Sequence, residues 1–218
     1  MIHSNLRDHA DGRVQRAILF ADNAHKGQKR KYSDPPEDYI SHPIAVAEHL
    51  LNQWPMNRHW TDVLVVALLH DVLEDTHVTV SDIIENFDEN IAARVVQITE
   101  VRYPDMDRKA RKEFYRSQIA AACDDVKLVK LADVWCNLSD FYAMVRHDKD
   151  FAEQYLWEKE KLVTGIRPNA DAFGPAMSVL NLIKCHREMY LSNFTGGCAG
   201  RHPSHTRLKA GPSVTSKT

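Results

Sequence analysis

Glycine and cysteine are scarce in this 218-residue chain, and charge of neither sign dominates. The chain has only eight glycines, half of them after residue 174, and it contains neither a G-x-G-x-x-G run nor a Walker-type loop. Glycine-rich phosphate-binding loops of these two kinds are therefore excluded. No apolar run approaches the roughly 20 residues needed to cross a bilayer, and nothing at the N-terminus resembles a signal peptide.

The four cysteines form no C-x-x-C pair, so we expect free thiols in a reducing, cytoplasmic location. The formal net charge of −2 gives no global attraction to nucleic acid or to anionic lipid. We therefore expect that neither nucleic acid nor a membrane is a partner. The sequence leaves the oligomeric state open.

Helical periodicity is what the chain has in abundance. Hydrophobic residues make up 44% and charged residues 27%, the balance of a globular protein. Apolar side chains recur with helical spacing, first over residues 11–27, and no run of alternating strands is found. We predict an all-α fold, a single bundle of about eight to ten helices over residues 1–194. Residues 195–218 lack apolar periodicity and are predicted to form a disordered C-terminal tail.

The stretch 67–76, Ala-Leu-Leu-His-Asp-Val-Leu-Glu-Asp-Thr, sets four polar side chains into an apolar helical run. A buried carboxylate without a partner costs several kcal/mol, so a bound cation is the simplest compensation. In one continuous helix His70 would lie over Glu74, and Asp71 over Asp75. An isolated His-Asp pair is more often a surface or capping pair. The two further carboxylates and the apolar lead-in favour a metal site.

Two further candidate ligands come from other segments. Asp133 ends the apolar run 126–132, which repeats the pattern of the central stretch. His42 lies at a helix start, where a histidine is more often a cap or a packed ring, so its assignment depends on the need of His70 and Asp71 for more ligands. The set His42, His70, Asp71 and Asp133 offers nitrogen and oxygen donors, which suit Mn, Fe or Zn better than Ca.

The chemistry that such a set favours is phosphoester hydrolysis. A metal held by four protein ligands retains positions for water and for a phosphate oxygen. Glu74 and Asp75 would then handle protons. The basic residues Lys29, Arg30 and Lys31 could dock a polyanion. A second charged segment, residues 107–113, is predicted to be a solvated helix surface.

Three motifs in this order resemble a known family. In chain order they are Gln-Lys-Arg-Lys with Tyr-Ile-Ser-His-Pro within 28–43, His-Asp-Val-Leu-Glu-Asp-Thr at 70–76, and Lys-Leu-Ala-Asp at 130–133 followed by Asn137. Over roughly residues 14–190 the chain resembles the alarmone hydrolase domain of the RelA/SpoT-type HD-domain phosphohydrolases. Because no nucleotide-synthesising domain follows, it is similar to a stand-alone small alarmone hydrolase.

The resemblance implies an all-α HD domain with one Mn²⁺ ion on the four predicted ligands, Zn²⁺ or Fe²⁺ being alternatives. It implies removal of the 3′-pyrophosphate of (p)ppGpp, releasing pyrophosphate and GDP or GTP, with Glu74 and Asp75 as catalytic carboxylates. It also implies that Arg30 packs on the base, that Lys31 contacts phosphate, and that Asn137 and Tyr155 contact the nucleoside.

The chain departs from the family pattern around the substrate. Its loop 32–38 is longer and carries Pro35 and Pro36, residues 134–136 lack the usual leading basic residue, and Ser139 replaces a frequent arginine. Hydrolysis of ppApp or removal of the NADPH 2′-phosphate therefore remain alternatives. A 5′-nucleotidase is disfavoured, because Glu74 with Asp75 and the basic residues 29–31 suit a longer polyphosphate than a monophosphate. A non-catalytic alarmone-binding module is disfavoured by the intact ligands.

Overall fold

The computed structural model describes residue 6 and residues 11–54, 60–166 and 170–191. The predicted all-α class is confirmed, since this part of the chain holds no strand and only one isolated β-bridge, between Lys29 and Asp38. The predicted tail, residues 195–218, lies outside the described residues. The helices are α1 (Gly12–Ala24), α2 (Ser41–Gln53), α3 (Trp60–Leu69), α4 (Val72–Asp75), α5 (Val80–Asn86), α6 (Glu89–Ile98), α7 (Arg108–Ala121), α8 (Asp124–Leu138), α9 (Phe141–His147), α10 (Lys149–Gly165) and α11 (Ala170–His186), followed by a π-helical turn, Arg187–Leu191.

Short polar side chains explain where many of these helices begin. A carboxylate that accepts a hydrogen bond from an amide of the first turn satisfies a donor that has no partner within the helix. Thr79 and Asp82 form a reciprocal capping box at the start of α5. Four helices, α1, α6, α7 and α10, begin after an aspartate that caps them in this way: Asp11, Asp88, Asp107 and Asp148.

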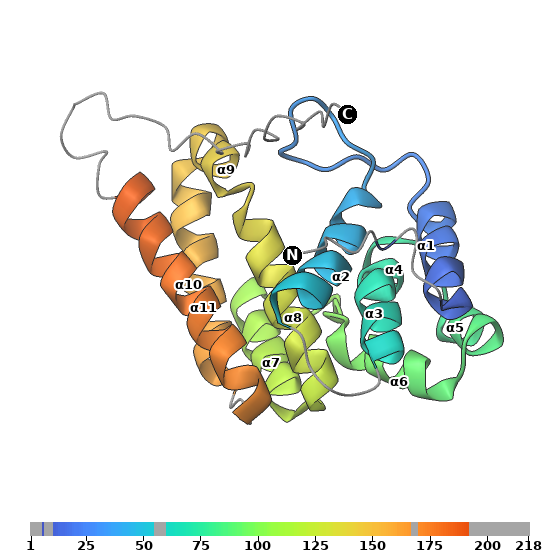
Figure 1. Cartoon of the computed structure of the whole chain (residues 1–218). Helices are drawn as coiled ribbons and strands as arrows, with labels where there is room; N and C mark the ends of the chain where they lie inside the picture. The colour runs from blue at the N-terminus through green and yellow to red at the C-terminus, as the bar shows by residue number, and fades with distance from the viewer. Residues whose placement is uncertain (1–5, 7–10, 55–59, 167–169, 192–218) are drawn as a thin grey trace, which may run out of the picture.

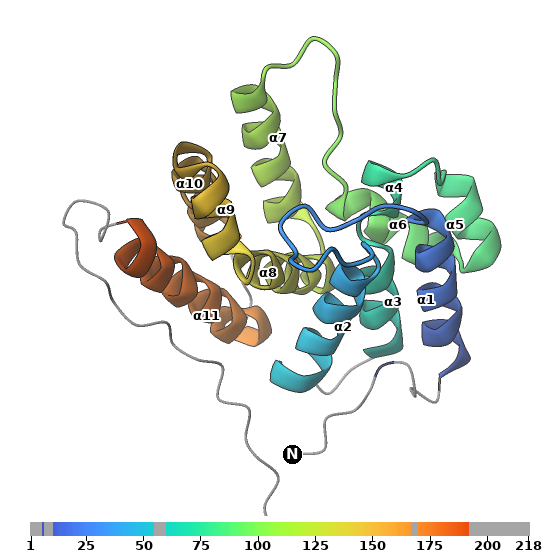
Figure 2. The same cartoon turned by 90° about the horizontal axis from the view of Figure 1, so that it is seen from above.

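Helix α8 forms the middle of the bundle. It packs against α2, α3 and α6 on one side and against α11 on the other. Figures 1 and 2 show α8 between the group formed by α1 to α6 and the group formed by α9 to α11. Residues 128–134 of α8 are all buried, including the charged Lys130 and Asp133. Two charges thus lie in the centre of the molecule, and they require partners there.

The central apolar stretch is not one continuous helix, and that prediction is wrong. Helix α3 ends at Leu69 and α4 begins at Val72, so His70 and Asp71 form the junction. His70 Nδ1 donates to the carbonyl oxygen of Ala67 at 2.8 Å, the oxygen that would accept the amide of residue 71 in a continuous helix. The Asp75 amide still bonds to the Asp71 carbonyl oxygen at 2.9 Å. Asp71 and Asp75 therefore remain one above the other, as predicted.

The connection between α1 and α2 brings basic residues close to this junction. Gly27 has φ 83°, a left-handed conformation that favours glycine, and it turns the chain after α1. The amide of Arg30 donates to the carbonyl of Glu37, and Gln28 Nε2 donates to the carbonyl of Asp75 at 2.8 Å. The connection is thereby closed on itself and attached to α4.

No helix of the described ranges combines the length and the apolar character required to span a bilayer.

Candidate metal centre and reaction cavity

Three buried side chains from three separate segments meet at the junction of α3 and α4. His42 comes from the first turn of α2, His70 from the junction, and Asp133 from α8. One potential ligand atom from each lies within 4.8 Å of the others. His42 Nε2 is 3.1 Å from Asp133 Oδ1, and His70 Nε2 is 3.7 Å from the same oxygen. The packing of α8 against α2 and α3 brings these atoms together.

The fourth predicted ligand, Asp71, borders this trio. Its Oδ2 atom lies 3.0 Å from His70 Nε2 and 3.7 Å from His42 Nε2. The same oxygen accepts a hydrogen bond from the Tyr39 hydroxyl at 2.6 Å. Burial and the Asp71 carboxylate raise the pKa of Tyr39 well above its ordinary value, so this hydroxyl stays a donor. Tyr39 thus fixes the orientation of Asp71.

The protonation of His70 shows why this cluster fits a cation. Because Nδ1 donates to a backbone carbonyl, the neutral ring presents the lone pair of Nε2 to the carboxylates of Asp71 and Asp133. Burial lowers the pKa of His70, but the two carboxylates outweigh it and raise the pKa to about 10. The cluster therefore attracts positive charge at the point where these atoms converge. Buried nitrogen and carboxylate donors without thiolates fit a borderline divalent ion.

Asp133 is also the centre of a hydrogen-bonded network on α8. Its Oδ2 atom accepts from Lys130 Nζ at 2.8 Å, and its Oδ1 atom accepts from Asn137 Nδ2 at 2.5 Å. Burial opposes ionisation of Asp133, but Lys130 and both histidines hold its pKa well below the ordinary value. Asp133 is therefore a carboxylate at any physiological pH. Asn137 is thus positioned by this carboxylate, on the face of α8 that the sequence indicates.

The acid pair Glu74 and Asp75 lies one turn beyond the junction. Glu74 accepts hydrogen bonds from the Glu100 amide at 3.2 Å and from Arg102 Nη2 at 3.3 Å. Asp75 Oδ2 is 3.5 Å from the Tyr39 hydroxyl. Burial is the main cause that raises the pKa of both carboxyl groups, and the Asp71 carboxylate adds to it. Both groups therefore hold a proton to a higher pH than a solvated acid does.

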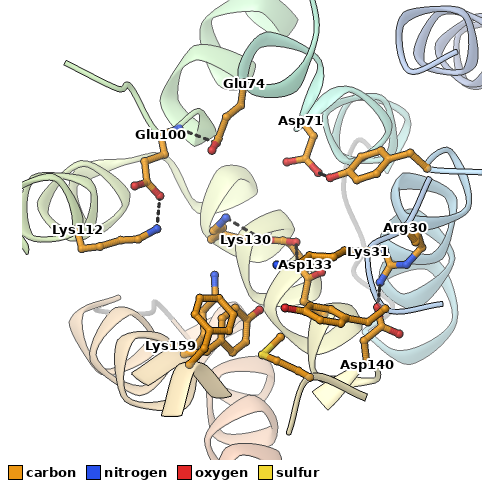
Figure 3. A pocket seen from close by; sticks show the side chains of 16 residues that line it. Arg30, Lys31, Asp71, Glu74, Glu100, Lys112, Lys130, Asp133, Asp140 and Lys159 are labelled. Atoms are coloured by element: carbon orange, nitrogen blue, oxygen red, sulfur yellow. Dashed lines mark hydrogen bonds and ion pairs between the residues drawn. The ribbon is translucent and has the colours of Figure 1, made fainter. Parts of the chain in front are cut away.

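A cavity of about 300 Å³ opens beside the cluster, and it contains most of the predicted substrate residues. Figure 3 shows Asp133 in its middle, with Lys112 and Lys159 on one side and Arg30 and Asp140 on the other. Of the predicted site residues, the lining includes Arg30, Lys31, Asp71, Glu74, Asp133, Asn137 and Tyr155. His42 and His70 lie buried behind this lining.

The three predicted basic contacts differ in placement. Arg30 is largely buried and forms an ion pair with Asp140. Lys31 Nζ lies 5.0 Å from the ring centre of Tyr32, at the cavity wall. Lys29 is not part of the lining, and its ammonium pairs with Asp38 at 2.7 Å. The structure therefore brings two of the three to the cavity.

Sequence reasoning missed the cationic wall opposite Arg30. Lys112 belongs to the charged segment that was predicted to be solvated, but its ammonium lines the cavity and pairs with Glu100 at 2.6 Å. Lys159 of α10 lines the same wall, and burial together with Lys130 lowers its pKa to about 8. One feature of the sequence could have indicated that Lys159 faces the cavity: it follows Tyr155 by four residues, so the two side chains lie on one face of the helix.

Comparison with known proteins places this site in a family. Residues 17–157, more than half of the chain, match the family described as the HD domain. The chain belongs to the HD domain family. The His70-Asp71 pair at the junction lies within the matched range.

Several named proteins are similar to this HD domain. It is 34% identical over 160 residues to the guanosine-3′,5′-bis(diphosphate) 3′-pyrophosphohydrolase MESH1 of Xenopus tropicalis, covering 71% of this chain and 84% of that protein. It is 35% identical over 137 residues to the bifunctional (p)ppGpp synthase/hydrolase SpoT of Escherichia coli K12. That match covers 61% of this chain and only 18% of SpoT.

A solved structure has the same arrangement of helices. The structure of a metazoan ortholog of SpoT that hydrolyses ppGpp matches with a TM-score of 0.70 and 26% identity, covering 82% of this chain and 97% of that one. The match therefore spans nearly all of that solved chain, whereas the match to bacterial SpoT spans less than a fifth of SpoT.

Proposed function

We propose that this HD domain hydrolyses the 3′-pyrophosphate of (p)ppGpp, with Mn²⁺ as cofactor, and releases pyrophosphate and GDP or GTP. The observation that carries the proposal is the shared cavity: Asp71 and Asp133 of the cluster, the acid Glu74 and two opposed basic walls all border one space of about 300 Å³, and the two histidines lie buried behind its lining. Similarity to proteins named for this activity supports it.

His42, His70, Asp71 and Asp133 are proposed as the metal ligands. Their donors converge from α2, the α3–α4 junction and α8, and the buried carboxylates create the demand for positive charge. When bound, a divalent ion supplies Lewis-acid chemistry, neutralising charge on the phosphoryl group and favouring ionisation of water. Mn²⁺ follows from the family resemblance and the donor set, and Zn²⁺ and Fe²⁺ are the alternatives.

Glu74 and Asp75 are proposed to move protons at the reacting phosphate. Glu74 lines the cavity, and Asp75 lies next to Tyr39 at its edge. Burial raises the pKa of both carboxyl groups, so each can carry a proton at a higher pH than a solvated carboxyl group can. A carboxyl group that gives its proton to the departing nucleoside oxygen removes the cost of expelling an alkoxide.

The two basic walls are proposed to hold the two ends of the substrate. Lys112 and Lys159 would meet the pyrophosphate that leaves, because their ammonium groups border the cavity opposite the base side. Arg30 would stack on the purine, and Lys31 would contact phosphate. Asn137 and Tyr155 line the space between these walls and are proposed to contact the nucleoside. Lys29 would add long-range attraction only, since it does not line the cavity.

The alternatives concern the substrate rather than the chemistry. A ppApp hydrolase or an NADPH 2′-phosphatase would use the same cluster, and a 5′-nucleotidase would leave the wall at Lys112 and Lys159 without a phosphate to bind.

A cytoplasmic location also remains a prediction. Cys123, Cys136 and Cys185 are free thiols in the structure, as expected from the sequence.

One assay panel tests the proposal. The metal-depleted enzyme is supplied in turn with Mn²⁺, Zn²⁺ and Fe²⁺, and release of pyrophosphate or phosphate is measured from ppGpp, ppApp, NADPH and deoxynucleoside monophosphates. We expect pyrophosphate from ppGpp, with the highest kcat/KM in Mn²⁺. Phosphate release from monophosphates or from NADPH, with ppGpp untouched, would replace the proposal by the corresponding alternative.

A further inference from the structure

A second and larger cavity, of about 660 Å³, lies between α7 and α10. We call it the α7–α10 groove. Five cationic side chains contribute to its lining, Arg108, Lys109, Lys112, Arg116 and Lys161, against two carboxylates. Lys112 also lines the reaction cavity, and no other lining residue is common to the two spaces. The groove is therefore a separate space that shares one wall residue with the proposed active site.

Internal ion pairs leave the groove with an excess of positive charge. Glu158 is bound by Arg108 through two hydrogen bonds, of 3.0 and 2.9 Å. Glu113 forms an ion pair with Arg116. Within the described ranges neither Lys109 nor Lys161 forms an ion pair. Both carboxylates are thus neutralised inside the groove, while two ammonium groups are available to an anion.

An indole surface lies among these cations. Trp157 is 51% exposed, which is unusual for so large an apolar side chain, and it lines the groove. Lys161 Nζ lies 5.8 Å from its ring centre. An exposed aromatic face beside lysine and arginine is the combination that binds a base by stacking and its phosphates by charge. The cavity volume falls in the range of about 300–1,000 Å³ found for small-molecule sites.

We propose that the α7–α10 groove binds a nucleoside polyphosphate as a second site, with its base on Trp157 and its phosphates on Lys109 and Lys161. The two sites are coupled through the helices that form the groove. Lys112 of α7 lines both spaces, and α10 carries Tyr155 and Lys159 to the reaction cavity. A polyphosphate in the groove places negative charge next to this shared wall, so occupancy of the groove weakens polyanion binding in the cavity.

Binding is tested with ATP, which has no 3′-phosphate, by titrating tryptophan fluorescence of the full chain. Trp157→Phe identifies the part of the signal that arises in the groove. The charge test is the double variant Lys109→Glu/Lys161→Glu. Its matched control is Lys149→Glu/Lys184→Glu, which makes the same change of charge on α10 and α11 at positions outside the groove lining. Arg30→Ala perturbs the reaction cavity alone.

We expect saturable quenching by ATP in the wild type, in Arg30→Ala and in the control variant. In the groove double variant ATP should bind at least tenfold more weakly. In Trp157→Phe the quenching should be lost. Quenching that disappears in Arg30→Ala and persists in both groove variants would overturn the proposal, and so would absence of saturable quenching. Inorganic tripolyphosphate binding as tightly as ATP would contradict the stacking role. Displacement of ATP by hexaglutamate at equal concentration would reassign the groove to an acidic peptide.

A kinetic readout tests the coupling and rests on the proposed function. Saturating ATP should raise the KM for ppGpp at least twofold in the wild type and leave it unchanged in the groove double variant. An equal rise in both would place the ATP effect in the reaction cavity. Because the fluorescence titration needs no turnover, failure of the proposed activity would leave the test of the groove intact.

Discussion

Replacing Asp133 by asparagine separates the charge of this side chain from its shape. In the wild type Asp133 is 3% exposed, and it faces Lys130 at 2.8 Å and His42 at 3.1 Å. Asparagine keeps the volume but leaves the ammonium group of Lys130 buried opposite a neutral amide. We expect Asp133→Asn to lose both metal and stability, for two different reasons.

The size of the stability loss follows from burial. Removing one partner of a buried ion pair costs about 3–5 kcal/mol, because the other charge stays desolvated. In a chain of this length each kcal/mol lowers Tm by roughly 2–4 °C, so metal-free Asp133→Asn should melt about 6–20 °C below the metal-free wild type. Thermal unfolding in EDTA gives this number. Elemental analysis after dialysis against Mn²⁺ gives the loss of bound metal.

A compensating variant separates the loss of stability from the loss of metal. In Lys130→Met/Asp133→Asn the orphaned charge is gone, so most of the stability should return while metal content and turnover remain low. If this double variant melts as low as Asp133→Asn, an unpaired Lys130 is not the cause of the loss. If Asp133→Asn keeps wild-type metal content and Tm, Asp133 is neither a ligand nor the partner that Lys130 requires.

Three further predictions concern catalysis and binding. Glu74→Gln and Asp75→Asn should keep the metal and the fold while kcat falls about 10²-fold or more, the range for loss of acid–base help, and loss of metal in either variant would make that residue a ligand. Arg30→Lys keeps the charge but removes a planar stacking surface, so KM should rise for ppGpp and stay nearly constant for inorganic tripolyphosphate; equal changes for both would place the purine elsewhere. Burial and Lys130 lower the pKa of Lys159 to about 8, so its ammonium is lost as pH rises through that value. The KM for ppGpp should therefore rise above about pH 8, and a profile that is unchanged in Lys159→Met would exclude this lysine from phosphate binding.

Local patterns in the sequence were sufficient for the class of fold. Helical spacing of apolar residues predicts an all-α chain because each helix must bury one stripe of its surface. The motif order also pointed to His42, His70, Asp71 and Asp133, and the structure places these side chains together. The prediction of a continuous central helix was wrong because the His70 side chain bonds, through Nδ1, to the backbone carbonyl of Ala67. The spacing of apolar residues gives no sign of such a bond.

Only the tertiary structure decided which charged residues face the reaction cavity. Lys29 and Arg30 are neighbours in one basic run. The closed connection between α1 and α2 nevertheless pairs Lys29 with Asp38, whereas Arg30 pairs with Asp140, which is far from it in the sequence. Lys112 lies in a segment whose charge predicts a solvated surface, and packing of α7 against α10 turns it inward. Composition fixes how many charges a helix carries, whereas the direction of each depends on the helices that pack around it.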